Sequence, residues 1–223
     1  MELQGAIFDM DGTLIDSLMF WDVLWAKLGQ MYFGDRTFRP DGVTEKAVRT
    51  LPLREASYLL HKNAAIGENG EAVFSVVNDA LAQFYAETVQ LKPGVRQFLD
   101  HCRQKGIKMC VASATNPVLL HIVMEKCGIS DYFSKIFSCS ENGRGKEHPD
   151  VFLKAHAHLG TPKESTWIFE DSIVALETAA KAGYHTVGVY DQYTFHADKV
   201  AAISTEYIGP GETLLRLIDE GKL

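Results

Sequence analysis

The chain has 223 residues, of which 46% are hydrophobic and 23% are charged. This composition is typical of globular proteins and argues against intrinsic disorder, collagen-like repeats and coiled coils. Acidic residues outnumber basic ones, 29 against 22, and the formal net charge of −7 disfavours a nucleic acid or an anionic membrane as the default partner.

The first element that the sequence predicts is a buried strand over residues 5–8, which is short and apolar and stops at a turn-forming cluster of Asp, Gly and Thr. From residue 15 to residue 91 the apolar residues recur at helical spacing, and no clear strand is visible. We therefore expect an all-helical insert after the first strand. The alternative is that these helices cover the sheet as extra layers.

Beyond the insert, helical and apolar extended segments alternate regularly. Proline or Asn-Pro opens several of the helical segments, and glycine closes them. The predicted strands are residues 107–112, 136–139, 166–169 and 186–189, and the predicted helices are residues 94–105, 117–127, 149–159 and 172–181.

Strands that are apolar throughout and alternate with helices are typical of a doubly wound parallel α/β sheet, because helices must cover both of its faces. The predicted organisation is an α/β core formed by residues 1–14 and 92–223, with a small helical cap domain formed by residues 15–91.

Polar side chains follow the predicted strands abruptly, at the edge where ligands bind in such sheets. They are Asp9, Asp11, Gly12 and Thr13 after the first strand, Ser113 and Thr115 after the second, Glu170 and Asp171 after the 166–169 strand, and Lys146 in a neighbouring loop. We expect Thr115 to be structural, and Thr13 to hold the turn through its hydroxyl.

Several carboxylates at one edge repel one another, by about 4 kcal/mol for a pair about 4 Å apart at an effective dielectric near 20. A divalent cation would relieve this repulsion, and carboxylate oxygens suit Mg²⁺. Phosphate could then bind between the cation and Lys146. Asp9 would attack phosphorus, Asp11 would transfer protons, and Gly12 would leave room for the phosphate.

These residues resemble the four motifs of the haloacid dehalogenase-like hydrolase superfamily. The motifs are Asp9-Met10-Asp11-Gly12-Thr13, Ser113, Lys146 within Gly-Lys-x-x-Pro-Asp, and Glu170-Asp171-Ser172. The helical insert is similar to the small cap of the subgroup that contains beta-phosphoglucomutase and phosphoglycolate phosphatase.

The resemblance implies a role for each matching residue. Asp9 would be phosphorylated, and Asp11 would act as general acid and base and bind magnesium through its main-chain oxygen. Ser113 and Lys146 would hold the phosphoryl oxygens. The remaining magnesium ligands would be Asp171 and Glu170. A carboxylate at Asp11 also favours phosphate chemistry over cleavage of a carbon–halogen bond.

The sequence departs from the family pattern at two places. Glu147 and His148 follow Lys146, where they could alter its properties or face solvent, and we expect them to face solvent. Residues 16–21 lack the histidine expected of the mutases. Arg54, in a stretch resembling the one that places an arginine over the substrate, is the candidate specificity residue.

We therefore expect a Mg²⁺-dependent phosphomonoester hydrolase that acts on a small phosphorylated metabolite, as a monomer or a small homo-oligomer. A phosphomutase and a non-catalytic protein that binds a phosphorylated ligand are the alternatives. The chain has no apolar run long enough to span a membrane, no basic leader, and four cysteines without metal-site spacing. These features predict a cytoplasmic protein with reduced thiols.

Overall fold

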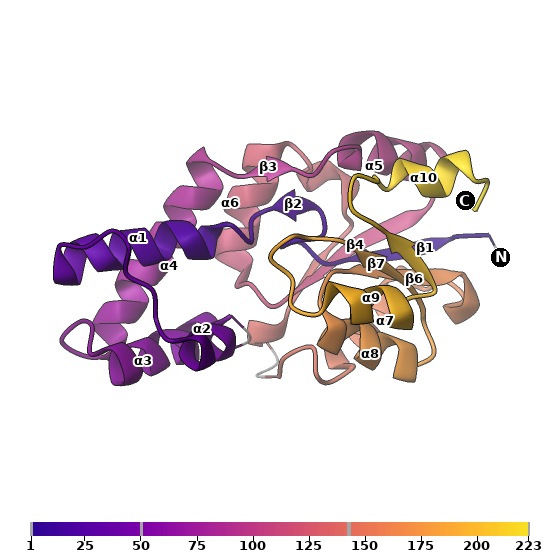
Figure 1. Ribbon diagram of the computed structural model, residues 1–223. Coiled ribbons are helices and arrows are strands. Elements are labelled where there is room, and N and C mark those ends of the chain that lie inside the picture. Colours follow the sequence, from indigo (N-terminus) through magenta and orange to yellow (C-terminus); the bar gives the residue numbers. More distant parts are fainter. Residues whose placement is uncertain (1, 50, 142–143, 223) are drawn as a thin grey trace. The chain divides into compact units, whose positions relative to one another are not determined.

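A computed structural model describes residues 2–49, 51–141 and 144–222. The chain forms two compact units, Met1–Leu18 with Val89–Leu223 and Met19–Thr88. The first unit is an α/β sheet unit and the second is a helical insert (Figure 1).

The sheet unit contains a parallel sheet whose strand order is β5-β4-β1-β6-β7-β8 within the described residues. The strands are β1 (Gly5–Phe8), β4 (Lys108–Ser113), β5 (Ile136–Ser138), β6 (Thr166–Glu170), β7 (His185–Val189) and β8 (Glu206–Ile208). The chain moves outward from β1 in one direction through β4 to β5, then returns to β6 on the other side. This reversal beside β1 is where ligands bind in open α/β sheets.

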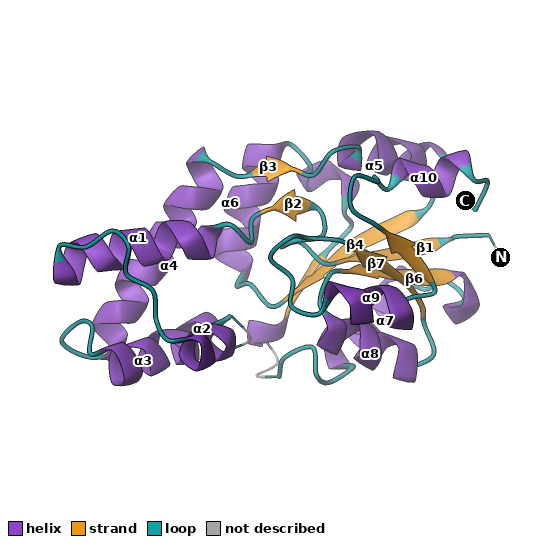
Figure 2. Ribbon diagram, viewed as in Figure 1, coloured by secondary structure: helices purple, strands orange, loops and turns teal. Residues whose placement is uncertain are grey.

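Helices cover both faces of this sheet (Figure 2). One face carries α5 (Val95–Gln104), α6 (Pro117–Cys127) and α10 (Leu215–Asp219), and the other carries α7 (Asp150–Leu159), α8 (Ile173–Lys181) and α9 (Ala197–Ile203). Short 3-10 turns lie at Ser130–Tyr132, Cys139–Glu141 and Lys163–Ser165. The doubly wound fold is confirmed, and each predicted strand and helix of this unit is correct to within one residue at either end.

Local signals explain these boundaries. Asn116 caps α6 by accepting a hydrogen bond from the Leu119 amide, Pro117 occupies the first turn, and Gly128 ends the helix in the left-handed conformation. Elements without such signals, namely β8, α9 and α10, were not predicted.

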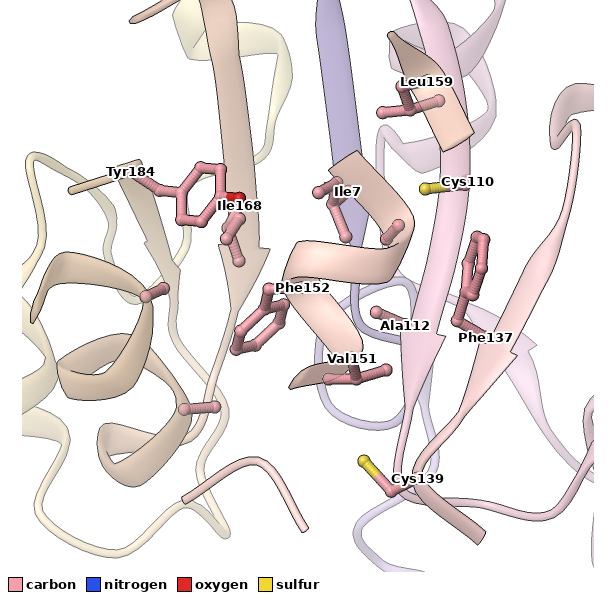
Figure 3. Close-up of a cluster of buried hydrophobic side chains, with 13 residues drawn as sticks. Ile7, Cys110, Ala112, Phe137, Cys139, Val151, Phe152, Leu159, Ile168 and Tyr184 are labelled. Atoms are coloured by element: carbon pink, nitrogen blue, oxygen red, sulfur yellow. The ribbon is translucent and has the colours of Figure 1, made fainter. Parts of the chain in front are cut away.

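One face of the sheet forms a buried cluster with α7 and α8. Figure 3 shows Phe152 and Val151 on α7 beside Ile7 and Ala112 of the strands. On the opposite face, Phe8 stacks on Phe169 with ring centroids 4.5 Å apart. Consecutive residues 7 and 8 are thus both buried, as expected for a strand covered on both sides.

The junction between the two units differs from the prediction. Ile15–Asp16 (β2) and Gln90–Leu91 (β3) pair as a short antiparallel ribbon within the sheet unit. The prediction that residues 15–91 contain no strand was wrong at these positions, and the boundaries predicted at residues 14 and 92 differ from the observed Leu18 and Val89. Two-residue strands are too short to show the alternating pattern that identifies a strand.

The insert consists of α1 (Phe20–Phe33), α2 (Gly42–Val48), α3 (Leu53–Ala64) and α4 (Gly70–Glu87). Asp41 and Asn69 cap α2 and α4 by accepting hydrogen bonds from main-chain amides of the first turn. Trp25 is buried in the insert, and its indole N–H donates to Glu45 at 3.3 Å. The described residues of the observed insert, Met19–Thr88, are helical or in loops, so the predicted helical character is confirmed for this part of the chain.

All four cysteines are buried and unpaired. Burial raises the pKa of the Cys102 and Cys110 thiols to about 12 and that of Cys139 to about 11, so these thiols are poor nucleophiles. No helix among the described residues is long and apolar enough to cross a membrane.

Phe152 provides a test of the core between α7 and the sheet. Its side chain is fully buried, whereas that of the adjacent Leu153 is 46% exposed. We expect Phe152→Ala to lower the free energy of unfolding by about 3–5 kcal/mol, and Leu153→Ala to change it by less than about 1 kcal/mol. Chemical denaturation followed by fluorescence measures both, and equal losses would contradict this packing.

Candidate active site

The carboxyl ends of β1, β4 and β6 bring four polar side chains to one edge of the sheet. Asp9 directly follows β1, Ser113 and Glu170 are the last residues of β4 and β6, and Asp171 comes next. All four are buried, with exposed fractions between 1% and 7%. Because β1 pairs with both β4 and β6, side chains from distant parts of the sequence meet there, as predicted.

Lys146 bridges two of these carboxylates. Its ammonium donates to Asp9 Oδ1 and to Glu170 Oε1, and its side chain is only 10% exposed. Burial lowers the pKa of Lys146, but the charges of Asp9 and Glu170 outweigh it and hold that pKa above its usual range. The lysine is therefore protonated and fixed by two charge-assisted hydrogen bonds.

A second oxygen of Glu170 is also engaged, because Oε2 accepts a hydrogen bond from the Ser172 amide at 2.9 Å. The side chain thus has a defined orientation at the start of α8. The sequence predicted Glu170 as a metal ligand, and the structure adds a contact in which Glu170 orients Lys146.

Asp9, Glu170 and Asp171 form a cluster that could hold a metal ion, with one oxygen of each lying within 4.8 Å of the others. Burial raises the pKa of Asp9 well above its usual range, although the charge of Lys146 lowers it. Burial and the charge of Glu170 raise the pKa of Asp171 to about 7. One ammonium thus does not neutralise three carboxylates, and these hard oxygen donors fit Mg²⁺.

Two hydroxyl groups hold the carboxylate of Asp11. Ser17 donates to Oδ1 at 2.7 Å and Thr115 donates to Oδ2 at 2.9 Å. Thr115 was expected to be structural; Asn116 caps the following helix, and the Thr115 hydroxyl instead bonds to Asp11. Neither Ser17 nor Thr115 carries a sequence signal for this role, because the contact depends on how loops from different strands meet.

The turn between Asp9 and Ile15 requires glycine at position 12. Gly12 has φ +79°, and a Cβ added there would lie 2.8 Å from Asp171 Oδ2. The space beside Gly12 is therefore taken by the Asp171 carboxylate. Thr13 does not hold the turn as expected: its hydroxyl is buried and has no hydrogen-bond partner among the described residues.

Ser113 accepts a hydrogen bond from the Thr115 amide at 3.1 Å, which orders the loop after β4. Its predicted contact with phosphate remains a prediction. Glu147 and His148 are half exposed, and neither forms an ion pair with Lys146, whose charged partners are Asp9 and Glu170.

The candidate specificity residue Arg54 lies on α3 of the insert, where it forms an ion pair with Glu71. Its guanidinium also sits 4.1 Å from the centroid of the Phe74 ring. The side chain is about half exposed, and its role toward a substrate remains a prediction.

Comparisons with known proteins identify relatives of this chain. The haloacid dehalogenase-like hydrolase family matches residues 3–183. Hexitol phosphatase B of Escherichia coli K12 is 30% identical over 195 residues, which cover 84% of each chain. The phosphorylated carbohydrates phosphatase of Thermotoga maritima is 24% identical over 83% of this chain and 84% of its own.

Solved structures show the same fold. A putative beta-phosphoglucomutase from Thermotoga maritima has a TM-score of 0.80 at 24% identity and covers 99% of both chains. CbbY from Rhodobacter sphaeroides, crystallised with phosphate, has a TM-score of 0.76 at 19% identity, with coverage of 92% of this chain and 93% of its own.

The fold is that of a doubly wound α/β protein with an acidic cluster and a buried lysine at the carboxyl edge of its sheet. More specifically, the chain belongs to the haloacid dehalogenase-like hydrolases.

The raised pKa of Asp171 makes stability depend on pH. A carboxyl group whose pKa is higher in the folded than in the unfolded protein binds more protons when folded, so it favours folding less as pH rises from about 4 to about 7. The Asn side chain does not titrate. We therefore expect the melting temperature of Asp171→Asn to rise relative to that of the unmodified protein as the pH is raised from 5.5 to 8, with chelator present in both samples. If the difference in melting temperature between the variant and the unmodified protein were the same at both pH values, the raised pKa of Asp171 would be contradicted.

Proposed function

We propose that this chain is a magnesium-dependent phosphomonoester hydrolase of small phosphorylated metabolites, with phosphorylated sugars or sugar alcohols as the substrate class. The observation that carries the proposal is Lys146 held between Asp9 and Glu170, beside Asp171. The phosphatase relatives support the substrate class, since one is named for hexitols and another for phosphorylated carbohydrates.

The first step is phosphoryl transfer to Asp9. A carboxylate oxygen of Asp9 attacks phosphorus, the bond from phosphorus to the substrate oxygen breaks, and that oxygen takes a proton from Asp11 as the alcohol leaves. The Ser17 and Thr115 hydroxyls, bonded to opposite oxygens of Asp11, keep this group from rotating away. Lys146 orients Asp9 and places a positive charge where phosphoryl oxygens bind.

The second step returns the enzyme to its starting state. Asp11, now ionised, accepts a proton from water, and the resulting hydroxide attacks phosphorus. The bond between phosphorus and the Asp9 oxygen breaks, so inorganic phosphate leaves and the Asp9 carboxylate is regenerated. Asp11 thus serves as the acid in the first step and as the base in the second.

Asp9, Asp171 and Glu170 would hold magnesium, together with the main-chain oxygen of Asp11. When bound, the ion offsets negative charge on the carboxylates and on the phosphoryl group. Ser113 and the Gly12 turn complete the proposed phosphate site, and the helical insert, with Arg54, would act as the cap that selects the substrate.

Substitution of the two aspartates tests the mechanism. We expect Asp9→Asn to abolish release of inorganic phosphate from an aryl phosphate and from hexitol, hexose and glycerol phosphates. Asp11→Asn should lower the rate by roughly 10² to 10⁴-fold while Mg²⁺ binding, measured by calorimetry, is retained.

Asp198→Asn, an exposed substitution on α9, is the matched control and should have full activity. Chelator should stop turnover, and Mg²⁺ should restore it. Full activity of Asp9→Asn would refute the proposal. Transfer of phosphate between positions of a hexose phosphate, without net release, would instead identify a mutase.

Arg54 tests the proposed role of the insert in specificity. If its guanidinium binds the polar part of the substrate, Arg54→Ala should raise KM for the preferred sugar phosphate by about tenfold and leave KM for an aryl phosphate within about twofold. Glu71→Gln, which removes only the ion-pair partner, is the control. An equal change for both substrates would exclude Arg54 as a specificity residue.

A further inference from the structure

Asp171 is held by a residue outside the four motifs. The Thr194 hydroxyl donates to Asp171 Oδ2 at 2.6 Å. Thr194 lies in the loop between β7 and α9, a segment in which the sequence shows no functional signal. A carboxylate anchored through one oxygen presents its other oxygen in a restricted orientation, which is the usual role of outer hydrogen bonds at metal sites.

Asp191 fixes the loop that carries Thr194. Its carboxylate Oδ1 accepts from the Tyr193 amide at 2.9 Å, and its main-chain oxygen accepts from the Thr194 amide at 3.1 Å. Only 3% of the Asp191 side chain is exposed. The position of Thr194 therefore depends on a buried, ionisable residue three positions earlier.

The charge partner of Asp191 is Lys92, which lies where the chain re-enters the sheet unit. Lys92 Nζ lies 2.9 Å from Asp191 Oδ2 and donates to the Tyr190 carbonyl at 2.7 Å. Lys92 directly follows β3, and its amide donates to the Leu14 carbonyl next to β2. It thus ties the β2–β3 ribbon, shown in Figure 1, to the loop after β7.

A buried ion pair is a weak source of stability compared with apolar residues of similar volume. The position of the Lys92–Asp191 pair suits it instead to fixing the loop that carries Thr194. Lys92 holds Asp191 and the Tyr190 carbonyl in place, and the loop that they fix carries the Thr194 hydroxyl to Asp171.

We propose that Lys92, Asp191 and Thr194 form a positioning network that orients Asp171 and sets the affinity of the site for Mg²⁺. The inference rests on the metal site of the proposed function. It assigns to the β2–β3 ribbon, where the insert joins the sheet unit, an influence on metal binding. All three are positioning residues, because they act through Asp171.

Titration of Mg²⁺ into the metal-free protein by calorimetry tests the network without measuring turnover. Thr194→Val, which removes the hydroxyl at nearly constant shape, should weaken Mg²⁺ binding by about tenfold. Thr194→Ser, which keeps the hydroxyl, should bind within about threefold of the unmodified protein. Thr178→Val is the control, since within the described part of the chain the Thr178 hydroxyl bonds only to a carbonyl of its own helix, and it should have no effect.

The ion pair is tested by Lys92→Gln with Asp191→Asn, a double change that leaves no unpaired buried charge. It should weaken Mg²⁺ binding severalfold. Adding Thr194→Val should give little further loss beyond that of Thr194→Val alone, because both changes act through the same hydrogen bond. Lys108→Gln, at the start of β4, removes a lysine that bonds a carbonyl and serves as the control.

Thermal unfolding in chelator shows which variants are folded, and Thr194→Ala replaces Thr194→Val if the latter unfolds. Unchanged Mg²⁺ affinity in a folded Thr194 variant would overturn the inference, and so would fully additive losses. Either result leaves the proposed function standing if Asp9→Asn is inactive. Conversely, weaker Mg²⁺ binding in Thr194→Val without any phosphatase activity of the unmodified protein would support the network and refute the function.

Discussion

The site depends on a balance of charge at one edge of the sheet, where three buried carboxylates face a single buried ammonium. Lys146 contacts Asp9 and Glu170, and the pKa values of Asp9 and Asp171 are raised. Such an arrangement is costly in a protein without a ligand. It is suited to a site that takes up a divalent cation and then an anion, and this is the physical basis for assigning phosphate chemistry to it.

The sheet supplies the rigidity that this balance requires. Strands β1 and β6 are buried on both faces, with Ile7 in the cluster against α7 and Phe8 stacked on Phe169 on the other side. Close packing of this kind leaves the ends of the strands little freedom. Asp9 directly follows the apolar residues of β1, and Glu170 follows those of β6. The packing of the core therefore fixes the positions of both residues.

The hydrogen bonds that orient the carboxylates of the candidate site come mainly from loops. Ser17 and Thr115 hold Asp11, and Thr194 holds Asp171. Thr115 and Thr194 belong to segments other than the ones that carry their partner motifs, and Ser17 lies six residues after Asp11. The motifs therefore supply the carboxylates of the candidate site, while residues in segments without a distinctive sequence pattern orient them.

The sequence alone was enough to predict the doubly wound sheet, the helical insert and the meeting of Asp9, Lys146, Glu170 and Asp171, because apolar periodicity and capping are local signals and parallel strands end at a common edge. It could not show the β2–β3 ribbon, whose two-residue strands have no period, nor the unpartnered hydroxyl of Thr13. The hydrogen bond between Thr115 and Asp11 spans 104 residues and that between Thr194 and Asp171 spans 23. Only tertiary structure decides such contacts, since a hydroxyl takes whichever acceptor the fold brings within reach.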